Sequence, residues 1–149
     1  MSRKAAEGLL AQVRDAVDRG ATLHVGGELA EHGWFTPAVL TGVTPDMRAY
    51  REELFGPVAV VYSVSDDDEA VALANDVPFG LGGAVFSSDE QRAIAVASRL
   101  EVGMANVNTS AGEGADVPFG GTKRSGFGRE LGPLGIGEFV NRRVFYVQR

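Results

Sequence analysis

Helical and strand-like segments alternate along this chain, and this alternation constrains its fold more than any other feature of the sequence. Apolar residues recur at helical spacing over 6–17, before the helix-ending Gly20, and again over 70–74 and 88–100. Short apolar runs of strand length separate or follow these helices, at residues 22–25, 36–43, 58–64, 83–86 and 103–108. Such an order favours an α/β fold, with a layered sheet whose strands are connected by helices.

The run at 58–64, VAVVYSV, is apolar almost throughout. Strands that read this way are usually covered on both faces and packed in parallel, so both properties are expected here. We expect Ser65 to cap the helix that follows, and Ser88 or Asp89 to cap the next one, because short polar side chains accept hydrogen bonds from the first free N–H groups of a helix.

Length and composition exclude several classes of protein. With 149 residues, the chain is expected to form one domain around a single core. No apolar stretch approaches a membrane span and no secretory signal is present, which predicts a cytoplasmic protein without a membrane partner. Fourteen basic against twenty acidic side chains leave a net charge of −6, which argues against nucleic acid as a partner.

The sequence contains no cysteine, and its only histidines are the isolated His24 and His32. Disulfides, thiolate metal sites and cysteine nucleophiles are therefore excluded, and a histidine-rich metal site is excluded with them. The acidic run at 66–69 lacks the glycine and the distal glutamate of a calcium-binding loop. We expect no metal.

Residues 117–132, VPFGGTKRSGFGRELG, belong to a long polar loop that spans 109–133. They fail the phosphate-loop pattern, because the lysine precedes the second pair of glycines, and they fail the dinucleotide pattern, because the glycine spacing is one residue too long and no strand leads into it. We interpret the glycines as positions where the backbone turns tightly. A helical turn near 136–140 and a strand over 143–147 are expected to close the chain.

Four pieces of sequence carry a resemblance to a known family: REELFGP at 51–57, AN at 74–75 with FGLG at 79–82, GMANVN at 103–108, and PFGGTKRSGFGRE at 118–130. In order and spacing they resemble the last third of the NAD(P)-dependent aldehyde dehydrogenases, and the resemblance covers essentially the whole chain. Succinate-semialdehyde dehydrogenases look most similar among the subfamilies, chiefly through the glycine-rich segment and the ending EFVN at 138–141.

The resemblance implies that residues 1–141 are the C-terminal portion of the catalytic domain and that residues 142–149 form a terminal strand used in oligomerisation. It therefore implies a homo-oligomer. It also implies that the complete enzyme uses NAD or NADP, needs no metal, and oxidises a small aldehyde to a carboxylic acid, with succinate semialdehyde as the candidate substrate.

Four residues fall at positions that bind cofactor or substrate in the family. Glu53 would accept hydrogen bonds from the hydroxyls of the nicotinamide ribose, since its two carboxylate oxygens match two adjacent hydroxyls; a solvated loop acid is the alternative. Phe55 would lie against the nicotinamide, with burial in a core as the alternative. Phe119 would lie near the reacting aldehyde, and Glu113 falls at a substrate-contacting position. Succinate-semialdehyde enzymes tend to carry a serine there, and an acid would repel the far carboxylate of that substrate.

The family's reaction requires a cysteine thiolate to attack the aldehyde, transfer of a hydride to the nicotinamide, and a glutamate base that activates water. No residue of this chain is assigned a catalytic role, because it has no cysteine and neither Glu52 nor Glu53 matches the motif of the base. We expect a C-terminal fragment, inactive alone, whose cysteine-bearing segment and nucleotide-binding domain precede Met1. The alternative is a truncated, non-catalytic module that associates with a full-length homologue.

Overall fold

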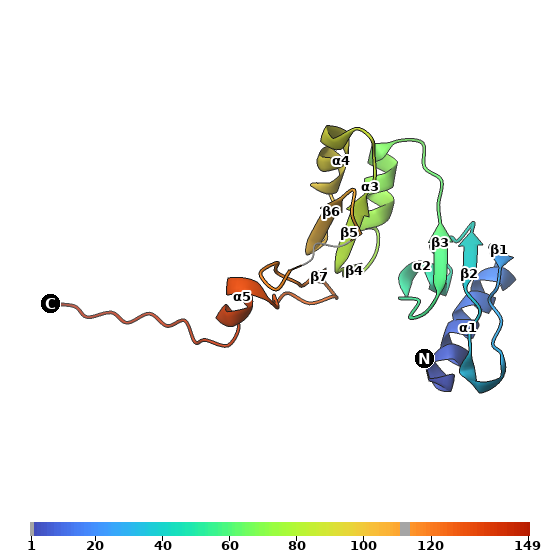
Figure 1. Ribbon diagram of the computed structural model, residues 1–149, viewed down its shortest axis with the longest axis horizontal. Coiled ribbons are helices and arrows are strands. Elements are labelled where there is room, and N and C mark those ends of the chain that lie inside the picture. The colour runs from blue at the N-terminus through green and yellow to red at the C-terminus, as the bar shows by residue number, and fades with distance from the viewer. Residues whose placement is uncertain (1, 111–113) are drawn as a thin grey trace. The chain divides into compact units, whose positions relative to one another are not determined.

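The computed structural model describes residues 2–110 and 114–149. Its helices and strands alternate over most of the chain, which confirms the predicted α/β class (Figure 1). In chain order they are α1 (Arg3–Asp18), β1 (Thr22–Val25), the 3-10 helix η1 (Glu31–Gly33), β2 (Ala38–Thr41), α2 (Arg48–Arg51), β3 (Val58–Val61), α3 (Asp67–Asn75), β4 (Phe79–Gly80), β5 (Gly82–Val85), α4 (Glu90–Ala97), β6 (Met104–Val107), β7 (Thr122–Lys123) and α5 (Gly132–Gly137).

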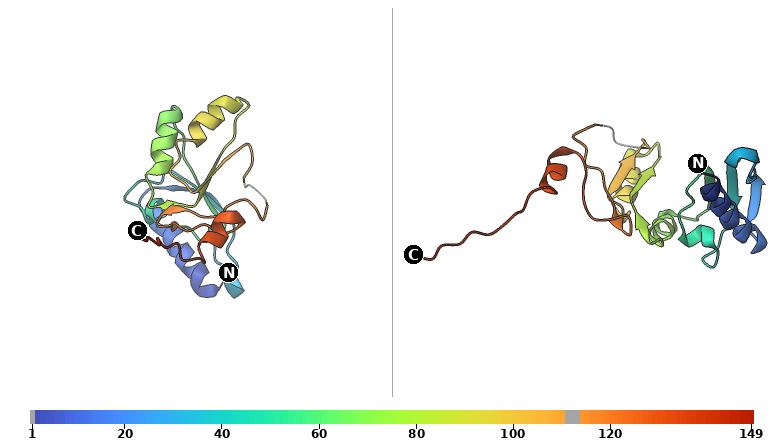
Figure 2. Two further views of the ribbon diagram at one scale, coloured as in Figure 1. Left: turned by 90° about the vertical axis from the view of Figure 1, so that its left-hand side faces the viewer. Right: turned by 90° about the horizontal axis from the view of Figure 1, so that it is seen from below.

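Strands β1, β2 and β3 form a three-stranded sheet in the N-terminal part of the chain. β1 runs antiparallel to β2, and β2 runs parallel to β3, with Ala38 opposite Val58 and Thr41 opposite Val61. The parallel packing predicted for the apolar run at 58–64 is therefore confirmed. Helix α1 packs against one face of this sheet (Figures 1 and 2).

The hydrophobic core lies between α1 and the sheet. Ala38 and Leu40 of β2 are buried in it, and Val58 and Val60 of β3 pack against it, because alternate side chains of a strand point to the same face. The opposite face is open: Val61 is 50% exposed. Within residues 2–65 no element packs on that second face, so the cover predicted for both faces of β3 is not provided there.

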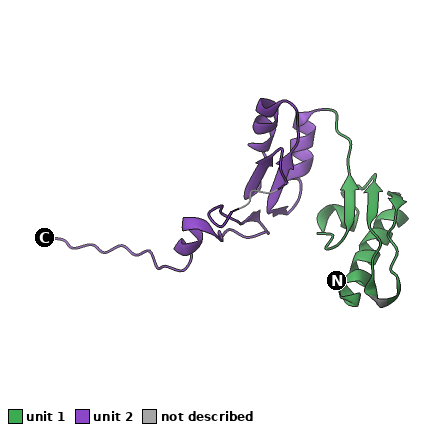
Figure 3. Ribbon diagram, in the orientation of Figure 1, with its two compact units in different colours: residues 1–65 green, residues 66–149 purple. Residues whose placement is uncertain are grey.

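The chain divides into two compact units, Met1–Ser65 and Asp66–Arg149, which we call unit 1 and unit 2 (Figure 3). The core cluster belongs entirely to unit 1. Among the described apolar residues of unit 2, the buried ones are Val71, Ala93 and Ala97. The structure therefore does not show the single core predicted from the length of the chain. The core cluster contains residues of unit 1 alone, and the three buried apolar side chains of unit 2 are small and are not part of it.

Unit 2 is built on two short strand pairs. β5 and β6 are parallel, from Gly82 opposite Met104 to Val85 opposite Val107, and α4 packs against both strands. β4 pairs antiparallel with β7, with Phe79 opposite Lys123. The polar loop expected over 109–133 therefore contains a strand, and this pairing holds the glycine-rich segment against β4.

Both main helices of unit 2 are capped at the N-terminus by an aspartate. The Asp66 carboxylate accepts a hydrogen bond from the Glu69 backbone N–H at 2.8 Å, so the cap of α3 lies one residue after the predicted Ser65. Asp89 caps α4 through the Arg92 N–H at 3.0 Å, as predicted. Serine and aspartate cap helices about equally well, so the sequence alone did not show whether Ser65 or Asp66 would be the cap.

The end of the chain differs from its prediction in two ways. Helix α5 spans Gly132–Gly137, earlier than the expected turn at 136–140, with Pro133 in its first turn, where a missing N–H has no cost. Residues 141–149 are exposed and extended, and the strand predicted over 143–147 is not formed (Figure 2). A strand requires a hydrogen-bonding neighbour, and no described strand of this chain pairs with these residues. Among the described helices, none combines the length and apolar character needed to cross a membrane.

Candidate functional site

Helix α1 holds the short helix α2 at its first residue. The Asp15 carboxylate accepts a hydrogen bond from the Arg48 backbone N–H at 2.9 Å, which satisfies a donor that the start of a helix leaves free. This hydrogen bond, with a further one from Arg19 at 3.0 Å, lowers the pKa of Asp15. A four-residue helix is not stable by itself, so α2 depends on this contact and on its packing against α1.

The last turn of α2 continues into Glu52, whose carboxylate is held from two sides. The Arg48 guanidinium donates to it from Nε, at 3.0 and 3.1 Å, and from Nη2, at 2.9 Å, and Nε2 of Gln12 on α1 also donates to it at 2.8 Å. The bonds from Arg48, followed by that from Gln12, lower the pKa of Glu52. Gln12 Nε2 also donates to the backbone carbonyl oxygen of Glu53 at 3.2 Å.

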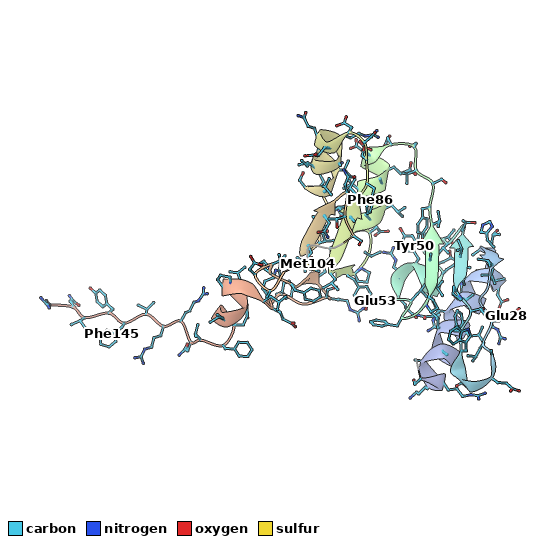
Figure 4. The ribbon with its side chains drawn as sticks, viewed as in Figure 1. Glu28, Tyr50, Glu53, Phe86, Met104 and Phe145 are labelled. Atoms are coloured by element: carbon cyan, nitrogen blue, oxygen red, sulfur yellow. The ribbon has the colours of Figure 1, made fainter. Side chains whose placement is uncertain are left out.

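Glu53 itself points its charge into solvent. Its side chain is exposed, and within the described residues its carboxylate has no hydrogen-bond or ion-pair partner (Figure 4). Two residues later, Phe55 is 76% exposed, so its burial in a core is wrong for this chain. The segment between α2 and β3 therefore presents an open carboxylate and an open aromatic ring two residues apart.

This pair fits the chemistry of a nicotinamide nucleotide. A free carboxylate has acceptor capacity for both hydroxyls of a ribose, and charge-assisted hydrogen bonds of this kind are about twice as strong as neutral ones. An exposed aromatic ring can take a flat heterocycle on its face. Glu52 is the poorer acceptor for such a ligand, since Arg48 and Gln12 already occupy its oxygens.

The glycine-rich segment of unit 2 folds back on itself. Phe119 and Glu130 exchange two backbone hydrogen bonds, at 2.9 and 2.7 Å. Inside the resulting turn, Nη1 of Arg129 donates to the carbonyl oxygens of Gly121 at 2.8 Å and Gly128 at 3.0 Å. A Cβ at Gly120 would collide with the Gly128 carbonyl, so this close approach requires a glycine.

The three cations of this segment contact protein groups. Lys123 Nζ donates to the carbonyl oxygen of Asn75 at 2.8 Å and pairs with the Glu101 carboxylate at 2.7 Å. The Arg124 guanidinium lies 5.3 Å from the centre of the Phe79 ring. Together with the bonds of Arg129, these contacts support a structural role for the cations over a role as phosphate ligands.

Phe119 lines a hollow of about 600 Å³ in unit 2. The side chain is 42% exposed, and other apolar members of the lining are Leu81, Leu131 and Phe139. This is a suitable wall for the carbon chain of a small substrate. Glu113 lies outside the described residues. No group of three or more His, Asp or Glu side chains that could hold a metal ion occurs in the described part of the chain.

The positions predicted from the sequence thus belong to different units, Glu53 and Phe55 to unit 1 and Phe119 to unit 2. Sequence reasoning missed Gln12 and the internal contacts of Arg129. Gln12 did carry a signal, because a polar residue occupies a position on the side of α1 that otherwise places Leu9, Val13 and Ala16 in the core.

Comparisons with known proteins agree with the resemblance. The model of the aldehyde dehydrogenase family matches residues 1–145. A succinate-semialdehyde dehydrogenase [NADP(+)] of Deinococcus radiodurans is 61% identical over 145 residues, which cover 96% of this chain and 30% of the relative.

Two solved structures illustrate the similarity in fold. Succinic semialdehyde dehydrogenase from Streptococcus pyogenes, in complex with NADP+, has a TM-score of 0.90 at 43% identity, over 99% of this chain and 33% of that one. Betaine aldehyde dehydrogenase from Staphylococcus aureus, in complex with NAD+, has a TM-score of 0.86 at 38% identity, over 91% of this chain and 28% of that one. The chain thus spans about 30% of the length of the relatives that it matches.

Proposed function

The chain belongs to the aldehyde dehydrogenase family, and from this premise we propose that it forms part of the cofactor and substrate walls of an NAD(P)-dependent aldehyde dehydrogenase. The reaction is the oxidation of an aldehyde to a carboxylic acid. When bound, the nicotinamide accepts the hydride that leaves the aldehyde carbon. Glu53 binds the ribose hydroxyls of that cofactor, and Phe55 lies against its nicotinamide ring.

The observation that carries this proposal is the open carboxylate of Glu53 beside the exposed ring of Phe55. Within the described residues nothing else uses this carboxylate, whereas the neighbouring Glu52 is held by Arg48 and Gln12. The Glu53 carboxylate can therefore bind the ribose hydroxyls without breaking an internal ion pair. Removing its charge should weaken ligand binding more than it lowers the stability of the fold.

For the aldehyde we propose an apolar wall that includes Phe119, with Glu113 as a further substrate contact whose negative charge opposes the far carboxylate of succinate semialdehyde. Succinate semialdehyde is the proposed substrate, and the support for it is the name of the relative from Deinococcus radiodurans at 61% identity. The related structure from Staphylococcus aureus is that of a betaine aldehyde dehydrogenase. These two aldehydes carry opposite charges at their far ends, so they are a sensitive pair of test substrates.

The chain contains no cysteine, so it supplies no thiolate nucleophile to this reaction. A test therefore needs the rest of a dehydrogenase. We define the hybrid dehydrogenase as the Deinococcus radiodurans relative in which this chain replaces the 145 matching residues. The hybrid is expected to form reduced cofactor with succinate semialdehyde, and a preference for betaine aldehyde would show that the negative charge of Glu113 decides the substrate.

The 149-residue chain by itself is expected to oxidise neither aldehyde with NAD or NADP. Steady formation of reduced cofactor by the isolated chain, in a preparation free of host dehydrogenases, would refute the assignment of the nucleophile to another part of the enzyme. A correctly folded hybrid without activity on any aldehyde would refute the proposed function itself.

We also propose that residues 142–149 add a strand to another subunit, giving a homo-oligomer. Support comes from apolar side chains in an extended segment, among which Phe145 is 84% exposed (Figure 4). Strand addition satisfies backbone groups and covers such side chains together. The hybrid truncated after residue 141 should then sediment as a smaller species than the intact hybrid. Unchanged sedimentation would exclude this role, while binding of the isolated chain to the intact relative would favour the non-catalytic module.

A further inference from the structure

Gln12 is a polar residue that is buried in unit 1, and packing of the hydrophobic core does not explain why a polar side chain occupies this position. Among the side chains that the structure describes, it is the only polar one that is buried, with 9% of its surface exposed. It lies on the core-facing side of α1, beside Val13 and one turn from Leu9 and Ala16. An apolar side chain of similar volume would fill the same space without the cost of burying an amide.

The side-chain amide of Gln12 donates hydrogen bonds to one turn of the chain, at Glu52 and Glu53. Nε2 donates to Oε2 of Glu52 at 2.8 Å and to the backbone oxygen of Glu53 at 3.2 Å. A primary amide carries two N–H donors, so two consecutive residues use both. The contact with Glu53 is made to its main chain, which leaves the side chain free.

Glu53 thereby lies between two anchored residues. On one side, Glu52 is bound by Gln12 and by Arg48; on the other, Leu54 packs against the core of unit 1. The Glu53 carboxylate remains exposed and, among the described residues, without a partner. A fixed main chain that carries a free ligand-binding group loses little conformational freedom on binding, which favours affinity.

We infer that Gln12 is a positioning residue for the cofactor: through the Glu52 carboxylate and the Glu53 carbonyl, it orients the main chain from which Glu53 reaches the ribose. This inference rests on the proposed ribose role of Glu53. Gln12 acts through Glu53. Because Gln12 belongs to α1, which packs in the core of unit 1, the core fixes the position of the cofactor-binding segment.

The test replaces Gln12 by methionine, which has similar length and volume but no donor. In the hybrid dehydrogenase, Gln12→Met should weaken NADP+ binding by about threefold to tenfold, the range expected for one or two lost hydrogen bonds. In the 149-residue chain, exchange of the Glu52 amide, which donates to the Arg48 carbonyl oxygen at 2.9 Å, should become faster, while exchange within the β2–β3 pairing stays unchanged. Gln12→Leu, which also lacks a donor and is uncharged, serves if the methionine variant does not fold.

Val13→Ala is the matched control, because Val13 neighbours Gln12, is buried to 2% exposure, and carries no polar group that could bond to the turn. It should lower the thermal midpoint and leave the NADP+ dissociation constant unchanged. If Val13→Ala weakens NADP+ binding as much as Gln12→Met does, general destabilisation explains the effect and the inference is wrong.

A double-mutant cycle with Glu53→Gln separates the inference from the proposed function. Loss of affinity in Glu53→Gln, with a smaller further loss when Gln12→Met is added, supports both. Loss in Glu53→Gln but none in Gln12→Met overturns the positioning role alone, and so do fully additive losses. Unchanged affinity in Glu53→Gln overturns the ribose role of Glu53, and the positioning role fails with it.

Discussion

At the scale of single residues, two adjacent glutamates differ because their neighbours differ. Glu52 is held by Arg48 and Gln12, while Glu53 has no side-chain partner among the described residues. Glu52 therefore helps to connect α1 with α2, and the Glu53 carboxylate is available to a ligand. The resemblance alone predicted Glu53, and not Glu52, as the cofactor ligand, and the contacts give a physical reason to prefer it.

Glu53→Gln in the hybrid dehydrogenase is expected to weaken cofactor binding about tenfold, since losing charge assistance at the ribose hydroxyls costs roughly 1 to 2 kcal/mol. The thermal midpoint of the apo protein should stay unchanged, because the exposed carboxylate is solvated when no cofactor is present. Cofactor titration and thermal unfolding of both proteins measure the two effects. Glu28→Gln, an equal loss of charge at another exposed glutamate of unit 1, should change neither quantity. A strongly destabilised Glu53→Gln apo protein would instead identify Glu53 as a structural acid.

At the scale of the elements, short helices and strands are stabilised by side chains from other parts of the chain. Helix α2 begins at a donor that Asp15 of α1 satisfies. Helix α3 ends where Lys123 of β7 donates to the carbonyl oxygens of Asn75 and Val77, at 2.8 and 3.3 Å. Both contacts join segments more than 30 residues apart, so local sequence patterns do not reveal them.

The contribution of the contact between α1 and α2 to stability should depend on pH, because the Asp15 carboxylate is part of this contact. Its pKa is lowered from 3.8 in the folded chain, so the ionised carboxylate stabilises the fold above that ordinary value, and this contribution disappears as pH falls through the lowered pKa. Asp15→Asn should therefore reduce stability at neutral pH and reduce it less near pH 3, where wild type has begun to lose the same contribution. Denaturant unfolding at several pH values measures this difference. Asp18→Asn, an exposed neighbour on the same helix, is the control; a wild-type pH profile in Asp15→Asn would contradict the prediction.

The connection between α3 and β7 should depend on Lys123. Lys123→Met removes the donor to Asn75 and Val77 together with the ion pair to Glu101, and is expected to destabilise unit 2 by about 1 to 3 kcal/mol. Amide exchange within α3 and the β4–β7 pair should become faster, while exchange in β1–β3 should not. Lys4→Met on the exposed side of α1 is the matched control. Unchanged exchange in α3 would show that these bonds add nothing to the stability of unit 2.

At the scale of the whole molecule, the chain exposes more apolar surface than its composition suggests. Large apolar side chains are exposed in both units, and Phe127, Ile136, Phe139 and Phe145 are examples in unit 2. Burial of such surface is the main favourable term in protein association. This exposed apolar surface is therefore available for association.

We expect the 149-residue chain to self-associate into a dimer or larger species at micromolar concentration, because association would cover this apolar surface. Sedimentation velocity over a range of concentrations measures the effect. Removing residues 142–149 should reduce association but not abolish it, since apolar side chains of α5 remain exposed. A monodisperse monomer at every concentration would contradict the prediction.

The sequence by itself determined the α/β class, the parallel placement of β3, most helices and strands, and the family, because these depend on local periodicity and on motifs at fixed spacing. Tertiary structure decided what distant contacts control: the division into two units, the open face of β3, the unpaired end of the chain, and the anchoring of the Glu53 turn by Gln12. Periodicity shows which side chains are apolar, but only the folded chain shows which of them find a partner. The same holds for polar groups, since a hydrogen bond across 41 residues leaves no local pattern.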